Sequence, residues 1–278
     1  MKISRLKEFL LRKPSVISVD TAYGKAHIYA IRDEDGRDKR LLEIGGGVQS
    51  ATYLDANWTD LTFRYHCIFD RAFEVHKNLE TVLMFGGGGF SYPKYLVSHH
   101  PHARIDVVEP DAEILQIARQ YFFLDRLEKE YETKENKRLR IFNTEGRPYL
   151  KTCPDLYDLV LNDAFTGKTP AQTLASLEAD FEIKQILKPH GIYMINVASA
   201  LEGRHSALLK AQVRTLRQAF SYVTILPSYR NLPEDRDNYV LAASDYPYDF
   251  HGALDIALPS NASIIHDKGN ITEQLAHR

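Results

Sequence analysis

The stretch TVLMFGGGGFSYPKYLVSHHPHARIDVVEPDAEIL, residues 81–115, decides the fold. It begins with the apolar run Thr81–Phe85, turns at four glycines, continues through the helical segment Tyr92–His100 and reaches the end of a second apolar run at Glu109. A buried strand followed by a helix and another buried strand is typical of parallel pairing with a right-handed crossover. The stretch therefore predicts a parallel sheet that helices cover on both faces.

The same alternation continues toward the C-terminus. Further strands are predicted at Arg140–Thr144, Tyr157–Asp163 and Gly191–Val197, and helices at Ala112–Phe122, Arg147–Lys151, Phe181–Leu187 and His205–Phe220. The segments Tyr222–Leu226 and Tyr239–Ala243 have no helix between them, so they predict an antiparallel pair at one edge. The charge-rich segment Asp125–Arg140 is expected to be a solvated excursion. The fold class is α/β, with a doubly wound, mostly parallel, seven-stranded sheet.

The chain before this sheet has a different pattern. Turn signals at Tyr23-Gly24 and Asp35-Gly36 separate short apolar runs, which is typical of β-hairpins. We predict a small N-terminal β-rich domain over residues 1–57 and a nucleotide-binding α/β domain over residues 58–278. The second begins with a helix over Leu61–Val75, where apolar residues recur at helical spacing.

Composition excludes several classes of protein. The 35 Lys and Arg residues nearly balance 37 Asp and Glu residues, so charge alone gives no reason to expect nucleic-acid binding. Two cysteines cannot build a disulfide framework, and no run approaches the ~20 apolar residues of a membrane helix. The histidines at 99, 100 and 102 have no acid at ligand spacing, so no metal is expected. These features predict a soluble, cytoplasmic protein with no membrane or nucleic-acid partner.

Polar residues follow three of the predicted strands, at the edge where an α/β sheet binds its ligand. The loop Gly86–Gly89 allows a tight turn and close approach to a ligand, and Glu109 can accept both hydroxyls of a ribose. Glu145 is placed to bind the exocyclic amino group of adenine. Asp163 can hold an amine or accept its proton. The pattern predicts a nucleotide site beside an amine site.

Several motifs, in this order and spacing, resemble spermidine synthase over roughly residues 15 to 245. They are Gly47-Val48-Gln49-Ser50, Tyr65-His66, Gly86–Gly89, Val108-Glu109-Pro110-Asp111, Tyr157-Asp158 with Asp163, and Leu187-Lys188-Pro189-His190-Gly191. The resemblance implies the fold of S-adenosylmethionine-dependent methyltransferases behind an N-terminal β-hairpin domain. It also implies an aminopropyl group passing from decarboxylated S-adenosylmethionine to a polyamine. Family members are commonly dimers, so a homodimer is expected.

The resemblance assigns a role to each matching residue. Gly86, Gly87 and Gly88 match the loop that holds the nucleotide, Glu109 matches the ribose ligand, and Asp163 matches the aspartate that deprotonates the amine. Glu145 takes the place of an aspartate near the adenine. Gln49 is assigned to the cofactor, and Tyr65 and His66 to the substrate.

Two departures separate this sequence from the family pattern. Gly89 stands where the family has an aspartate that holds the aminopropyl ammonium group, and Thr166, at the substrate side, stands where it has a second carboxylate after Asp163. The loss of two carboxylates is a large change in a site for cationic amines. It leaves open whether the donor is S-adenosylmethionine, used for methyl transfer, or its decarboxylated form.

Two hypotheses that assign the chain to another class of protein also remain open. A non-catalytic adenosine-nucleotide-binding protein would keep Glu109 and not need Asp163. A nicotinamide-dependent oxidoreductase would use Gly86, Gly88 and Ser91 as an approximate dinucleotide-binding motif, with serine in place of the third glycine.

Overall fold

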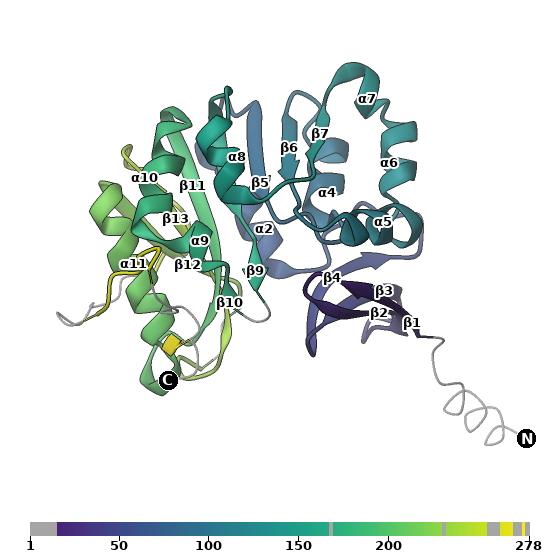
Figure 1. Ribbon diagram of the computed structural model, residues 1–278, viewed down its shortest axis with the longest axis horizontal. Helices are drawn as coiled ribbons and strands as arrows, with labels where there is room; N and C mark the ends of the chain where they lie inside the picture. Colours follow the sequence, from purple (N-terminus) through teal and green to yellow (C-terminus); the bar gives the residue numbers. More distant parts are fainter. Residues whose placement is uncertain (1–15, 167–168, 230–231, 255–261, 269–273, 276–278) are drawn as a thin grey trace, which may run out of the picture.

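The computed structural model describes residues 16–166, 169–229, 232–254, 262–268 and 274–275, and for Thr166, Thr169 and Arg204 it describes the backbone alone (Figure 1). Its centre is a seven-stranded sheet in the order β12-β13-β11-β8-β5-β6-β7. The strands are β5 (Thr81–Phe85), β6 (Arg104–Val108), β7 (Leu139–Phe142), β8 (Tyr157–Asn162), β11 (Leu187–Ser199), β12 (Tyr222–Pro227) and β13 (Asp237–Ser244). The predicted fold class is confirmed.

Strand direction follows the predicted alternation. Strands β7, β6, β5, β8 and β11 pair in parallel, while β13 pairs antiparallel with both β11 and β12. Every residue of β5 and of β8 is buried, as strands covered on both faces require. Strands β12 and β13 therefore form the antiparallel edge that was predicted because no helical segment separates them.

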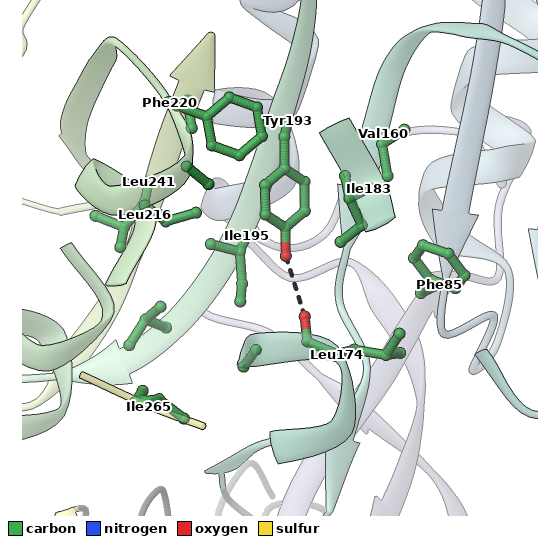
Figure 2. Packing of buried hydrophobic residues seen from close by; sticks show 14 of the residues in the cluster. Phe85, Val160, Leu174, Ile183, Tyr193, Ile195, Leu216, Phe220, Leu241 and Ile265 are labelled. Carbon is green, nitrogen blue, oxygen red and sulfur yellow. Dashed lines mark hydrogen bonds between the residues drawn. The ribbon is translucent and has the colours of Figure 1, made fainter. Parts of the chain in front are cut away.

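Helices cover both faces of this sheet (Figure 1). One face packs against α8 (Gly146–Thr152), α9 (Gln172–Ala175), α10 (Leu177–Gln185) and α11 (Ala207–Ala219). Figure 2 shows this core around Tyr193, whose hydroxyl donates to the Leu174 carbonyl at 3.2 Å. The other face packs against α2 (Arg64–Asp70), α3 (Ala72–Val75), α4 (Ser91–His99) and α6 (Leu124–Glu130).

The N-terminal β-structure is a separate four-stranded antiparallel sheet. It consists of β1 (Ile17–Thr21), β2 (Gly24–Arg32), β3 (Asp38–Ile44) and β4 (Gly47–Tyr53). Its apolar face packs on Ile114, Ile117 and Phe122, which belong to α5 (Ala112–Tyr121) or follow it. The small sheet therefore packs against α5. The domain boundary at residue 57 stays a prediction.

Three predicted segments differ from the structure. The helix over Leu61–Val75 begins only at Arg64 and is interrupted at Arg71. The segment Asp125–Arg140 is not a simple excursion, because buried Leu124 and Leu127 anchor α6, and α7 (Thr133–Asn136) follows. The helix predicted at Phe181 begins earlier, at Leu177, where the Ser176 hydroxyl caps it.

A buried lysine links helix α4 to the small sheet. Lys94 on α4 is 1% exposed, and its Nζ donates to Thr52 Oγ1 at 2.8 Å and to the Phe122 carbonyl at 2.9 Å. Among the described residues no acidic group lies within ion-pair distance of this ammonium. Burial lowers the pKa of Lys94 to about 7.

The buried lysine predicts a specific dependence of stability on pH. Between about pH 7 and the unfolded pKa of ~10.4, the unfolded chain binds a proton at Lys94 that the folded chain does not, so stability rises with pH. The free energy of unfolding of the wild type, relative to Lys94→Met, should increase by roughly 4–5 kcal/mol across this window. Urea denaturation of both proteins at pH values across the window measures it. If the difference in free energy of unfolding between the two proteins did not change with pH, the lowered pKa of Lys94 would be contradicted.

Candidate functional site

The glycine loop lies where β5 ends, between the ends of its two parallel neighbours. Gly86 has a φ of +88°, and a Cβ there would lie 2.6 Å from the carbonyl oxygen of Asp163. Phe85 pairs with Val108 of β6 and with Asn162 of β8. Only glycine allows this approach of the two backbones, so the loop and the residue after β8 form one edge.

Glu109, directly after β6, holds the loop in place. Its Oε2 accepts hydrogen bonds from the N–H groups of Gly87 at 2.9 Å and Gly88 at 3.2 Å, and its Oε1 accepts one from Asp111 at 3.1 Å. The side chain is 5% exposed, and burial raises its pKa against the opposing effect of these N–H donors. A carboxylate that organises the loop thus lies at the centre of the edge.

A first cavity of about 310 Å³ lies above this edge. The glycine loop, Glu109 and Glu145 form its polar wall. Its apolar wall comes from both sheets and from two helices, and includes Ile44, Val108, Ile114 and Leu174. Tyr23 from the small sheet also lines it, and burial together with nearby Glu145 and Glu109 raises its pKa to about 12. The cavity therefore combines apolar surface with carboxylates at two strand ends.

Asp163, directly after β8, is held by side chains from two other elements. Its Oδ2 accepts from the Tyr65 hydroxyl at 3.0 Å and lies 3.4 Å from His66 Nε2, while its Oδ1 accepts from Asn196 Nδ2 at 2.9 Å. Burial, and next the carboxylate of Asp163, raise the pKa of Tyr65 well above its usual value. Tyr65 is therefore a neutral donor that orients the carboxylate.

A second cavity, of about 360 Å³, lies on the other side of Asp163. Its wall includes Phe63, Tyr65, Asn196, Arg236 and Asn238. Three residues line both cavities: Gln49, Asp163 and Phe165. Two compartments therefore meet at one carboxylate.

Most of the residues predicted from sequence meet here. The first cavity is lined by Gln49, His66, Gly86, Gly87, Gly88, Glu109, Glu145 and Asp163, and the second by Tyr65. Gly89 lines neither cavity, and the Thr166 side chain lies outside the described part of the chain. Sequence reasoning missed Asn196, although a polar residue within the apolar strand GIYMINV is a usable signal.

Gly89 is enclosed by packed side chains. A Cβ at this position would lie 2.6 Å from Ser50 Oγ and 2.8 Å from the Phe122 ring. Ser50 is itself fixed by a 3.0 Å hydrogen bond with Ser91 Oγ. A side chain at residue 89 therefore has no room unless Ser50 and Phe122 both move.

The described residues include neither a membrane-spanning helix nor a cluster of metal ligands. No helix among them is long and apolar enough to cross a bilayer. No group of three or more His, Cys, Asp or Glu side chains among them is arranged to hold a metal ion.

Comparisons with known proteins converge on one family. The spermine/spermidine synthase domain matches residues 62–241. A polyamine aminopropyltransferase of Vibrio vulnificus is 28% identical over 179 residues, which cover 63% of this chain and 55% of that protein. The chain spans about half the length of the curated aminopropyltransferases it matches.

This chain is also similar to a methyltransferase and to a solved structure. An eEF1A lysine and N-terminal methyltransferase homolog of Drosophila melanogaster is 28% identical over 176 residues, 60% of this chain and 24% of that protein. The crystal structure of a probable spermidine synthase from Corynebacterium glutamicum superposes with a TM-score of 0.72 at 21% identity. It covers 92% of this chain and 97% of the other, which shows a shared fold.

The packing around Gly89 predicts a steric penalty. Gly89→Ala should lower the free energy of unfolding by roughly 1–3 kcal/mol, the usual range for overpacking a close-packed site. Gly46→Ala is the matched control, because a Cβ at Gly46 would meet nothing within 4 Å. Only the φ of +72° opposes this change, and it should lower the free energy of unfolding by roughly 1 kcal/mol. Urea denaturation measures both variants. A Gly89→Ala protein as stable as the wild type would show that the pocket around residue 89 is not closed.

Proposed function

Because the chain belongs to the spermine/spermidine synthase family, we propose that it is a transferase that moves an alkyl group from an adenosyl sulfonium donor to an amine. One observation carries this proposal: two cavities meet at Gln49, Asp163 and Phe165. The donor occupies the first cavity and the acceptor the second. Their reacting atoms then approach each other beside the Asp163 carboxylate.

The first cavity suits an adenosine. Glu109 accepts the ribose hydroxyls with the lone pairs that its three backbone donors leave open. Glu145, at the start of α8, accepts from the adenine amino group. The apolar wall, with Ile114 and Val108, packs on the base.

The chemistry is a displacement at carbon. The amine lone pair forms a C–N bond as the C–S bond breaks, and the sulfonium leaves as a neutral thioether. Asp163 accepts the proton that the amine loses. Before that transfer, its carboxylate can hold the protonated amine in place. Tyr65 and Asn196 keep this carboxylate oriented, so the protein acts mainly by aligning two reactants.

The absence of a carboxylate at residue 89 favours S-adenosylmethionine and methyl transfer. The aspartate that the family pattern has at this position would repel the α-carboxylate of that donor, and here Ser50 and Phe122 close the space. The names of the aminopropyltransferase relatives favour the decarboxylated donor, which is the second candidate. A cytoplasmic location and a homodimer are also part of this proposal, and none of the relatives named above is a nicotinamide enzyme.

Two variants test the two compartments separately. Asp163→Asn removes charge and basicity while keeping shape, so turnover should fall by ~10²–10⁴-fold, the span of a positioned proton acceptor. Binding of S-adenosylhomocysteine should remain unchanged. Glu109→Gln should instead weaken that binding by ~1–3 kcal/mol, the range for a lost charged acceptor. Calorimetric titration and mass spectrometry of transferred label measure the two quantities.

The outcomes distinguish the proposed function from its alternative. Full turnover in Asp163→Asn would remove Asp163 from the chemistry. Nucleotide binding with no transfer to any amine would favour the non-catalytic nucleotide-binding protein. An unchanged affinity in Glu109→Gln would remove Glu109 from the donor site.

A further inference from the structure

Ser50, on β4, lies against the glycine loop in the wall of the first cavity. It lines that cavity and is 3% exposed. A Cβ at Gly88 would lie 4.0 Å from the Ser50 Oγ, and a Cβ at Gly89 would lie only 2.6 Å from it. The small sheet therefore places a hydroxyl directly beside the loop, at the side of the cavity where α4 begins.

The hydrogen bonds around Ser50 determine what its hydroxyl can still do. The Ser91 hydroxyl donates to the Ala51 carbonyl at 2.7 Å. A hydroxyl has one proton, so in the 3.0 Å contact between Ser50 Oγ and Ser91 Oγ the donor is Ser50. The Ser50 oxygen keeps its lone pairs. It can therefore accept a hydrogen bond from a ligand, such as one from an ammonium group.

Hydrogen-bond donors lie beside this acceptor, at the start of α4. Ser91 and Tyr92 begin the helix and line the first cavity, and the first N–H groups of a helix have no intrahelical partner. The N-cap residue, Phe90, provides no side-chain acceptor for them. Backbone N–H groups at this position favour an anion, and a carboxylate is one.

A buried imidazole borders the same part of the cavity. His66 lines the first cavity and is 3% exposed, and its ring centroid lies 5.9 Å from that of Tyr92. Its Nε2 faces Asp163, whereas its Nδ1 has no hydrogen-bond partner in the described part of the chain. A buried polar atom without a partner costs free energy, so this nitrogen indicates a polar ligand group beside it.

The charges of the lining do not suit a lone cation beside Ser50. Among the described residues, no Lys or Arg lines the first cavity, and its acids are Glu109, Glu145 and Asp163. Under the proposed function, the first two bind the adenosine and the third serves the acceptor amine. A lone ammonium group beside Ser50 would therefore be buried without a counter-ion, which is costly, whereas a zwitterion carries its own.

We propose that Ser50 and the start of α4 bind the zwitterionic amino-acid group of the donor, and that the neutral Ser50 hydroxyl makes the site select S-adenosylmethionine over its decarboxylated form. This inference rests on the proposed function, whose donor it specifies. The Ser50 oxygen accepts from the α-ammonium group, and the N–H groups of Ser91 and Tyr92 donate to the α-carboxylate. Ser50 is thus a specificity-determining residue that the small sheet supplies.

The experiment uses the full chain and three ligands that share the adenosine and the sulfur. S-adenosylhomocysteine has the whole amino-acid group, its decarboxylated analogue has the amine alone, and methylthioadenosine has neither. Calorimetry should show that the wild type binds S-adenosylhomocysteine at least about tenfold more tightly than either of the others, the scale of one charged hydrogen bond.

Two variants at residue 50 separate the contact from its charge. Ser50→Ala should reduce the advantage of S-adenosylhomocysteine over methylthioadenosine about tenfold, while the affinity for methylthioadenosine stays the same. Ser50→Asp should bind the decarboxylated analogue more tightly than S-adenosylhomocysteine, because a carboxylate repels the α-carboxylate and pairs with a lone ammonium group. Ser18→Ala is the matched control on β1, and since Ser18 lines neither cavity, all three affinities should stay unchanged.

Each outcome bears on a different claim. Failure of all three ligands to bind would overturn the proposed function itself. Adenosine binding with a wild-type preference for the decarboxylated analogue would overturn this inference alone. An unchanged advantage over methylthioadenosine in Ser50→Ala would also overturn it, because Ser50 would then act only through the fold. The wild type and Ser50→Ala decide the inference even if Ser50→Asp does not fold.

Discussion

The close approach of two backbones, Gly86 to Asp163, is the constraint on which the rest of the site depends. Strands β5, β6 and β8 run parallel and end in register, so the loops that follow them crowd one edge. Gly86 fits against the Asp163 carbonyl only because it has no side chain, and Glu109 holds the next two N–H groups. The geometry therefore brings the glycine loop and the Asp163 carboxylate to the same edge of the sheet, where an α/β sheet binds its ligand.

The small sheet supplies part of the wall of both cavities. Gln49 lies in β4, in contact with both cavities, and Ser50 bonds to Ser91 at the start of α4. Lys94 ties the same helix to Thr52. These buried polar contacts fix the wall of the first cavity that the small sheet supplies, and Ser50, held in this way, packs with Phe122 around Gly89. The departure from the family loop is thus accommodated by packing from β4 and from the residue that follows α5.

Much of this arrangement could be predicted from the sequence, since strand-helix alternation and apolar runs determine which loops share an edge. Gly86, Glu109 and Asp163 were identifiable because each follows a buried strand. The partners of Asp163 could not be derived in the same way. Tyr65 lies 98 residues from it in sequence, and Asn196 joins it only through the pairing of β11 with β8. The enclosure of Gly89 by Ser50 and Phe122 depends on tertiary packing, which no local pattern encodes.

A crystal structure with S-adenosylhomocysteine bound tests the central claim most directly. The account predicts the ribose hydroxyls on Glu109, the adenine beside Glu145, and the sulfur at the junction where Gln49, Asp163 and Phe165 separate the two cavities. The second cavity should stay open to solvent. A nucleotide in the second cavity, or one in the first with its sulfur directed away from Asp163, would contradict the account.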